Sequence, residues 1–460
     1  MAELPTSVQL SPLDLLMPRT HIAALLTFRT AKPSNSIIES LQAGLDSLSK
    51  TIPWLSGQVF PTVATETRGL EIRYQHAGPA PQLVNKGTIN ASYDELSTEG
   101  LPPNAIPADV WPVPQMIDEE LFAAGTPVFS ASLFRFADSQ GVGLCVCMHH
   151  NAVDATGFAE IVRSWAQHIA QSAPSSAIQN GDRSSRLSDV LRSDLQVVSS
   201  LAVETLFELH PEYSKIPPAF PAEFSPCTYK IFSLSVTQIN AYKEHLKGYL
   251  SDTPSTNTLV CALVWSAITH ARMQCRPALF NGSSRLAMAV NGRRRLGAEF
   301  SPPDNPYLGN AIFYSLTSSA VSDLDTLPDS MTSFAKMCDM IAQSQSPAKI
   351  NSQHIAEVYS LVENTDDYRS IYVGWDLFSS RDLTITSWAD LDLYGLSFGE
   401  GLGTPEFVRV PGSAADGVAI VLPRNKESSA TGEIVEIMVM LQSDDMDVLQ
   451  QDAIWERFNV

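Results

Sequence analysis

The sequence has little positive charge and no long hydrophobic run, and each absence argues against a class of protein. Lysine and arginine number 30 against 50 aspartates and glutamates, so the formal net charge is −20 at pH 7. A surface this acidic repels phosphates, so we expect no nucleic-acid partner. No segment reaches the roughly 18 consecutive apolar residues that a membrane span needs, so we expect no membrane partner. Residues 1–20 also lack the basic and apolar regions of a secretory signal.

Cysteine is scarce, and its spacing indicates neither a zinc site nor a disulfide framework. The six cysteines include no CxxC pair. Cys145 and Cys147 lie two residues apart in an apolar segment, and in a strand both side chains would point to one face. We therefore expect buried, reduced thiols and a cytoplasmic location.

The chain is long enough for two lobes. It has 460 residues, of which 44% are hydrophobic and 17% charged, so a buried core is expected and disorder is not. A polar stretch at residues 171–186 and a proline-rich stretch at residues 217–226 interrupt the regular patterns. The polar stretch is typical of a surface linker or of the start of a long crossover. We predict an N-terminal lobe at residues 1–185, a crossover linker at 186–225 and a C-terminal lobe at 226–460.

Strand and helix patterns alternate in both halves of the chain. Two strands are predicted at residues 128–137 and 142–150, followed by a helix whose apolar face includes Phe158, Val162 and Trp165. The second half adds strands at 229–236, 285–293 and 434–441, a buried helix at 258–273 and an amphipathic helix at 443–458. The glycines at 399, 401 and 403 precede Thr404 and Pro405, where we expect no helix to open, so a dinucleotide site is not indicated. The pattern predicts an α/β (α+β) fold of mixed sheets flanked by helices.

The segment CMHHNAVDATGF, residues 147–158, carries the most chemical information. His150 follows an apolar strand, and Asp154 precedes the amphipathic helix. An imidazole with an ordinary pKa of about 6.5 can accept a proton near neutral pH. Asp154 can orient the local backbone, cap the helix or pair with a cation. Two other interpretations stay open: a satisfied polar histidine without a catalytic role, and a metal site formed with His149.

A second segment, TITSWADLDLYGLSFGEGLGTP at residues 384–405, makes the pattern more specific. HHNAVD (149–154), TSW (386–388) and SFGEG (397–401) together resemble the HHxxxD and DFGWG motifs of the BAHD acyltransferase superfamily. Ser397 replaces the usual aspartate, and Glu400 replaces the usual tryptophan. The TSWADL segment is most similar to that of the fungal secondary-metabolite O-acetyltransferases, such as those that act on trichothecenes. Further stretches that resemble the family, in its order, are LSPLDLLMPR (10–19), IPWLSGQV (52–59), AVNGRRRL (289–296) and NPYLGN (305–310).

The resemblance implies a particular architecture. The family has two lobes like chloramphenicol acetyltransferase, each a mixed β-sheet flanked by helices, with a channel between them. A segment near residues 370–400 is expected to pair with the N-terminal lobe, and residues 10–19 are expected to enter that lobe as a strand. His150 would lie in mid-channel, with CoA approaching from one side and the acceptor from the other. Asp154 would have a structural role and would pair with Arg293.

The resemblance also implies the reaction and its site residues. His150 would remove a proton from a hydroxyl or amine as it attacks the thioester, and Thr386 or Trp388 would stabilise the oxyanion. Separately from the resemblance, Arg293 and Arg295 belong to the densest basic run of an acidic chain, so we expect them to contact the CoA phosphates. A solvated arginine face or pairing with Asp154 explains these arginines equally well. Trp388 can also be core packing, and Thr386 can be only a strand residue. We expect acetyl-CoA or another acyl-CoA as co-substrate, a small-molecule acceptor, no permanently bound cofactor, no metal and a monomer.

Two rival functions share part of this pattern. Condensation domains of peptide synthetases also carry the histidine motif and use carrier-bound donors, but they normally have glycine where this chain has Ala155. The altered SFGEG loop allows a relative that binds a metabolite without turning it over. The intact His150 argues against that second alternative.

Overall fold

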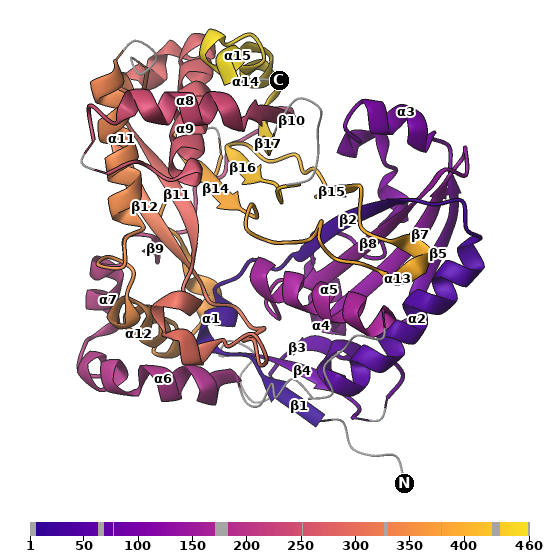
Figure 1. Cartoon of the computed structure of the whole chain (residues 1–460). Coiled ribbons are helices and arrows are strands. Elements are labelled where there is room, and N and C mark those ends of the chain that lie inside the picture. The colour runs from indigo at the N-terminus through magenta and orange to yellow at the C-terminus, as the bar shows by residue number, and fades with distance from the viewer. Residues whose placement is uncertain are drawn as a thin grey trace.

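Two separate β-sheets form where the sequence has its apolar strands, one in each half of the chain (Figure 1). The computed structural model describes residues 6–62, 69–76, 78–170, 183–250, 252–325, 330–378, 380–425 and 433–458. The α/β fold expected from the sequence is confirmed, with helices beside both sheets. No helix in these ranges has the length and hydropathy to cross a membrane.

The sheet of the N-terminal lobe positions the catalytic segment. Its strand order is β15 (Phe407–Arg409), β2 (His21–Arg29), β8 (Gly141–His149), β7 (Phe129–Phe136) and β5 (Leu83–Ile89). All nine residues of β8 are buried, because the strand lies in the middle of the sheet and its side chains are covered on both faces. Helix α5 (Ala155–Ile169) follows directly and packs against α2 (Ser34–Thr51). Only five residues, His150 to Asp154, therefore separate a rigid strand from a rigid helix.

The C-terminal lobe contains a six-stranded mixed sheet. Its order is β10 (Cys227–Ser235), β17 (Ile434–Gln442), β16 (Val418–Val421), β14 (Leu383–Ser387), β11 (Ser283–Asn291) and β12 (Ile312–Ala320). Strand β14 runs parallel to both of its neighbours, β11 and β16, and the other pairs are antiparallel. Helix α9 (Thr256–Cys275) is apolar on most sides and forms the centre of this lobe's core.

The remaining elements cover these sheets or connect them. The small sheets consist of β1 (Thr6–Gln9), β4 (Leu70–Tyr74), β3 (Gln58–Pro61) and β6 (Thr126–Pro127), and of β9 (Tyr213–Ser214) with β13 (Tyr372–Val373). The other helices are α1 (Pro12–Leu15), α3 (Tyr93–Thr98), α4 (Glu119–Ala124), α6 (Arg183–Val198), α7 (Val203–Leu209), α8 (Val236–Leu246), α10 (Val321–Asp325), α11 (Met331–Ser344), α12 (Ser352–Glu363), α13 (Gly399–Leu402), α14 (Ser443–Leu449) and α15 (Ala453–Phe458).

One strand from the second half of the chain joins the first sheet. Strand β15 pairs antiparallel with β2, which places a late segment at the edge of the N-terminal sheet (Figure 1). This strand lies just after the range 370–400 in which we expected the exchange. Within the expected linker, α6 and α7 are helices rather than extended chain. Most of the polar stretch at 171–186, namely residues 171–182, lies outside the described residues.

Two local expectations are wrong, each for a local reason. Residues 10–19 are not a strand, because Ser11 caps a short helix with Asp14 in a reciprocal capping box. The C-terminal amphipathic segment is two helices, because Asp452 accepts from the Trp455 amide and starts a second helix. The expectation for the glycine-rich loop is met: no helix opens at Thr404 and Pro405, and a single helical turn, α13, precedes them and ends at Leu402. Gly403 follows this turn with a φ of 71°, which favours glycine.

Candidate active site

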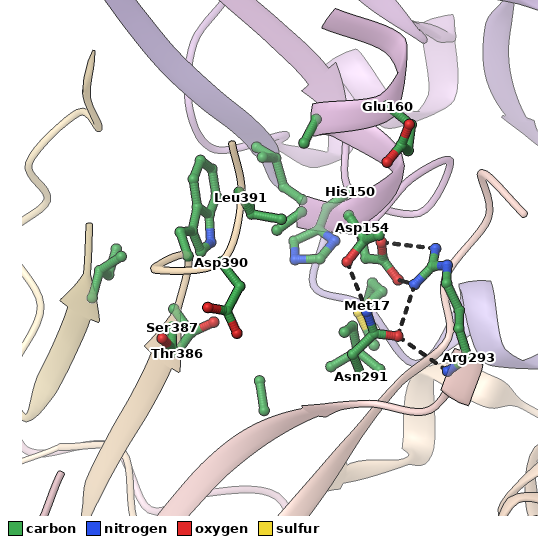
Figure 2. Close-up of a pocket in the computed structure, with 18 of the residues that line it drawn as sticks. Met17, His150, Asp154, Glu160, Asn291, Arg293, Thr386, Ser387, Asp390 and Leu391 are labelled. Carbon is green, nitrogen blue, oxygen red and sulfur yellow. Dashed lines mark hydrogen bonds and ion pairs between the residues drawn. The ribbon is translucent and has the colours of Figure 1, made fainter. Parts of the chain in front are cut away.

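His150 stands at the wall of a large cavity between the lobes. It follows the last residue of β8, and its backbone amide donates to the Thr20 carbonyl at 2.9 Å. The cavity has a volume of about 1280 Å³ and is lined by residues of both sheets. Figure 2 shows the imidazole pointing into this space, between the pair Asp154–Arg293 on one side and Thr386 on the other. The ring is therefore neither sealed in packing nor placed on an open surface.

Asp154 points away from the cavity centre and is fully engaged by protein partners. Its side chain is 1% exposed and accepts four hydrogen bonds. Arg293 donates two of them, Nη1 to Oδ2 at 2.8 Å and Nη2 to Oδ1 at 3.0 Å. The amides of Gly157 and Ala311 donate the other two, each at 2.9 Å. Asp154 thus caps α5 and joins the two lobes, and its oxygen atoms are not available as catalytic or metal-binding groups.

Arg293 does not fit the expected contact with CoA. Its guanidinium is buried, and its five N–H groups all have acceptors within the protein. Besides Asp154, the acceptors are the carbonyls of Tyr307 at 3.0 Å and Gly309 at 2.7 Å and the Asn291 side chain at 3.4 Å. A phosphate could reach this group only by displacing those bonds. The geometry therefore assigns Arg293 to the structural pairing with Asp154 that the resemblance implied.

Burial keeps the His150 imidazole neutral. Desolvation lowers its pKa below the ordinary value of 6.5, opposed by its own backbone and by the nearby Asp154 carboxylate. Nδ1 is buried and has no hydrogen-bond partner among the described residues. A neutral imidazole is the form that can accept a proton, so the site is prepared for general-base chemistry near neutral pH.

The sequence analysis missed two residues that fix the position of His150. The Asn310 side-chain amide donates to the His150 carbonyl at 2.9 Å and to Asp14 Oδ1 at 2.9 Å. Asp14 is fully buried at the start of the chain and also accepts from the Asn310 backbone amide. The stretches LSPLDLLMPR (10–19) and NPYLGN (305–310) contain both residues, but no local pattern shows that they meet. The contact spans 296 residues of sequence.

His149 belongs to the sheet and not to the cavity. As the last residue of β8 it alternates to the opposite face from His150, where it is fully buried and packs edge-on against His21 at 5.8 Å. Its Nδ1 accepts from the Asn151 amide at 3.2 Å. The carboxylate oxygens of Asp154 already accept four hydrogen bonds. This geometry therefore does not support the alternative metal site formed by His149, His150 and Asp154.

Thr386 and Trp388 both line the cavity, at the end of β14 and just after it. Trp388 is 7% exposed and packs against Phe158 of α5 with ring centroids 5.9 Å apart. Its position therefore combines core packing with access to the cavity. Asp390, which the sequence analysis did not single out, is fully exposed and adds a carboxylate to the same wall (Figure 2).

The remaining arginines of the NGRRR run are better placed than Arg293 to meet an anion. Arg294 is exposed and lines the cavity, and its guanidinium forms no ion pair within the described part of the chain. Arg295 also lines the cavity but donates to the Gln345 carbonyl at 2.8 Å. Arg163 of α5 adds a third cation, shared with Glu160 at 3.4 Å. These arginines form a local basic region in an acidic chain.

The SFGEG loop lies apart from the cavity, because none of its residues lines it. Phe398 anchors the loop: it is 1% exposed and packs against Phe28 at 5.2 Å and Trp165 at 6.0 Å. Among the described residues, the Glu400 carboxylate forms no ion pair, and Asp392 accepts from the nearby Gly395 amide. Aromatic packing thus holds this loop, in which Ser397 stands where the family pattern has an aspartate.

Comparisons with known proteins agree with this site and fold. The family model described as "Transferase family" matches residues 3–454. Trichothecene 8-O-acetyltransferase of Fusarium sporotrichioides is 26% identical over 96% of this chain and 96% of its own length. Fumigaclavine B O-acetyltransferase easN of Aspergillus fumigatus is 27% identical over 91% of this chain and 90% of its own.

A solved structure shows the same fold. TRI101 of F. graminearum, crystallised with coenzyme A and T-2 mycotoxin, superposes with a TM-score of 0.81 at 20% identity and covers 98% of this chain and 99% of its own. The similarity extends over both lobes, so the two-lobed architecture is shared in full.

Proposed function

Since the chain belongs to the Transferase family, the BAHD family that its motifs resemble, we propose that it transfers an acyl group from acyl-CoA to a small secondary metabolite. The chain is an acyltransferase, and its curated relatives carry names of O-acetyltransferases. We infer acetyl as the acyl group and a hydroxyl as the acceptor, with an amine as the alternative nucleophile. The observation that carries the proposal is the neutral imidazole of His150 in a cavity bounded by both lobes.

Proton removal is the first task of the site. His150 accepts the proton of the acceptor hydroxyl as its oxygen attacks the thioester carbonyl, a general-base step worth about 10²–10⁴-fold in rate. The tetrahedral intermediate then expels the CoA thiolate, which takes the proton back from the imidazolium. The acyl group passes directly to the acceptor, so no side chain need form a covalent intermediate. Asn310 supports this step, because it holds the His150 carbonyl and so fixes the backbone that carries the ring.

Stabilisation of the oxyanion is the second task. Thr386 and Trp388 both line the cavity, at the end of β14 and just after it, and Figure 2 shows Thr386 across from the Asp154–Arg293 pair. One donor aimed at the developing oxyanion is typically worth about 10²–10³-fold in rate. We assign this role to these two groups jointly. Closure of the cavity between two sheets limits the access of water that would hydrolyse the thioester.

Binding of CoA needs cations that are not already paired. We infer that Arg294 provides the main charge, with Arg295 and Arg163 beside it, because all three line the cavity. This replaces the expected role of Arg293. The formal charge of −20 makes such a local basic region necessary for an anionic co-substrate.

Two further properties complete the proposal. We infer a monomer, since the cavity is complete within one chain and the residues assigned to it come from the two lobes of that chain. We also infer a cytoplasmic location, which the six unpaired cysteines support.

The experiment that tests the proposal is free-thiol release from acetyl-CoA with a panel of alcohols and amines. The proposal predicts release that depends on the acceptor and on His150, so that His150→Ala loses about 10²-fold or more. Release only from a carrier-protein thioester would favour a condensation-type enzyme. Saturable metabolite binding without release from any donor would favour a binding protein.

A further inference from the structure

Two histidines and two glutamates meet outside the cavity, on elements that the proposed reaction does not use. His210 ends α7, and Glu212 immediately precedes β9. His354 and Glu357 lie one helical turn apart on α12. His210 and Glu212 are almost completely buried, and the side chains of His354 and Glu357 are 16% and 13% exposed. None of the four lines the active-site cavity.

Three of the four side chains, those of His210, Glu212 and His354, converge on one point. Glu212 Oε1 lies 3.0 Å from His210 Nδ1 and 3.5 Å from His354 Nε2. One nitrogen of each histidine and one oxygen of Glu212 all lie within 4.8 Å of one another. His354 Nε2 is buried and has no hydrogen-bond partner among the described residues, although it faces Glu212. That nitrogen therefore has a lone pair or a proton that the protein alone does not satisfy.

These separations match the edges of a metal coordination sphere. Zinc binds imidazole nitrogen and carboxylate oxygen at about 2.0–2.2 Å, so two ligands at a tetrahedral angle are about 3.3–3.5 Å apart. The Glu212–His354 distance lies in this range, and the Glu212–His210 distance is slightly shorter. Ring packing is also suitable, since the two imidazoles are nearly perpendicular with centroids 4.7 Å apart.

An outer partner for one ligand is already in place. His210 Nε2 lies 3.1 Å from Glu357 Oε2, on the opposite side of the ring from Glu212. A histidine that binds metal through one nitrogen usually donates its other N–H to a carboxylate, which fixes the tautomer. Gln353 in turn donates to Glu357 Oε1 at 2.9 Å. Glu357 and His210 thus have the arrangement of the carboxylate and histidine in a carboxylate–histidine–metal site.

Charge also favours a cation at this point. Glu212 and Glu357 are two carboxylates with little access to water, and neither forms an ion pair with lysine or arginine in the described ranges. A protonated His210 would offset only one of the two charges, whereas a divalent ion offsets both.

We propose that His210, Glu212 and His354 bind one divalent transition-metal ion, zinc by preference, with Glu357 orienting His210. Nitrogen and carboxylate ligands in a three-residue set suit zinc, and a water can complete the fourth position. The ion joins the segment after α7 to α12, which also packs against α6 and α1. Its role is to hold the crossover between the lobes, and it takes no part in acyl transfer.

The test uses the full-length protein without a histidine tag. Zinc content is measured after exhaustive dialysis and after reconstitution with Zn²⁺, and Tm is measured with and without a chelator. We expect about one zinc per chain and a fall in Tm of at least about 2–4 °C when the chelator removes it. Substitution by Co²⁺ should give the visible absorption of a tetrahedral nitrogen–oxygen site.

Variants separate this site from adventitious binding. His354→Gln should lose the zinc and the response of Tm to chelator, whereas His245→Gln, at an exposed histidine on α8, should keep both. Acetyl transfer by His354→Gln well below its Tm should stay within twofold of wild type. If wild-type protein binds less than a tenth of an equivalent of zinc after reconstitution and its Tm ignores both metal and chelator, the cluster is a hydrogen-bonded network and the proposal is wrong. That comparison needs no variant, so it holds even if His354→Gln fails to fold.

Discussion

At the scale of single residues, neighbouring side chains of the HHNAVD segment have unrelated tasks. His150 faces the cavity, His149 faces the packed side of the sheet, and Asp154 faces Arg293. Alternation along a strand separates the two histidines, and the first turn of α5 fixes the aspartate. Of these three polar residues, only His150 is therefore placed where it can react with a substrate.

The Asp154–Arg293 pair gives a prediction for stability. In Asp154→Asn the buried guanidinium loses its counter-charge, and breaking a buried pair in this way typically costs about 3–5 kcal/mol. We expect a large fall in the free energy of unfolding, measured by urea denaturation, and reduced activity that follows from the lower folded fraction. The control Glu39→Gln changes an exposed carboxylate on α2 and should unfold as wild type does. A fully active Asp154→Asn of normal stability would contradict the structural role.

The assignment of the oxyanion donors gives a prediction for kinetics. Trp388→Phe keeps the ring packing on Phe158 but removes the indole N–H, so kcat should fall by about 10²-fold if Trp388 is the principal donor, with little change in the KM of the acceptor. Thr386→Val tests the second donor in the same way. Steady-state kinetics with one good acceptor are sufficient. If neither variant lowers kcat, both groups are packing residues and the donor lies elsewhere.

The role of Arg294 gives a prediction for co-substrate binding. Arg294→Ala removes an exposed cation that forms no ion pair with the described residues, so the KM for acetyl-CoA should rise several-fold while the KM for the acceptor stays unchanged. Raising the salt concentration should reduce the difference between variant and wild type, because salt screens an exposed charge. An unchanged KM for acetyl-CoA would remove Arg294 from the CoA site.

At the scale of elements, secondary structure could be predicted from the sequence wherever a residue pattern is local and extends over many residues. The run at 142–150 and the helix with Phe158 and Trp165 became β8 and α5 because periodicity over nine or more residues reports burial directly. Helix α1 was missed because four residues held by one capping box leave no periodic signal. Asn310 was missed for a different reason: its contacts with Asp14 and His150 depend on how distant segments pack.

The SFGEG loop gives a prediction at this scale. Phe398 fills the space between Phe28 and Trp165, so Phe398→Ala should lower the free energy of unfolding by about 3–5 kcal/mol. Because the loop does not line the cavity, kcat/KM per folded molecule should be unchanged. Glu400→Ala, in the same loop but exposed, should alter neither quantity. Loss of stability in Glu400→Ala would show that its carboxylate also helps to hold the loop.

At the scale of the whole molecule, the two lobes are connected by more than the chain that runs between them. Strand β15 places the second half of the sequence in the first sheet, and Arg293 and Asn310 cross to Asp154, Asp14 and His150. The two-lobed fold could be inferred from motif order, but the position of the exchanged strand could not, because three residues of strand give no distinct pattern. The shared cavity exists only when these contacts have formed.

The free energy of unfolding of the whole molecule should fall as the pH drops below 6.5. Burial lowers the pKa of His21, His149 and His150 in the folded state, so below pH 6.5 the unfolded chain binds more protons than the native one. The stability that these neutral histidines contribute is present above pH 6.5 and is lost as the pH falls below it. Urea denaturation between pH 7.5 and 5 should show this decrease. A flat profile would contradict the burial of neutral imidazoles.

The central claim is that the cavity holds His150 as a neutral base for the incoming nucleophile. The most direct measurement is the pH dependence of kcat/KM for acetyl transfer, in wild type and in His150→Ala, over the range in which the protein stays folded. The account predicts an acid limb in wild type with an apparent pKa below 6.5, a plateau above it, and a loss of about 10²–10⁴-fold without this limb in the variant. Activity of His150→Ala within tenfold of wild type, with the acid limb preserved, would contradict it.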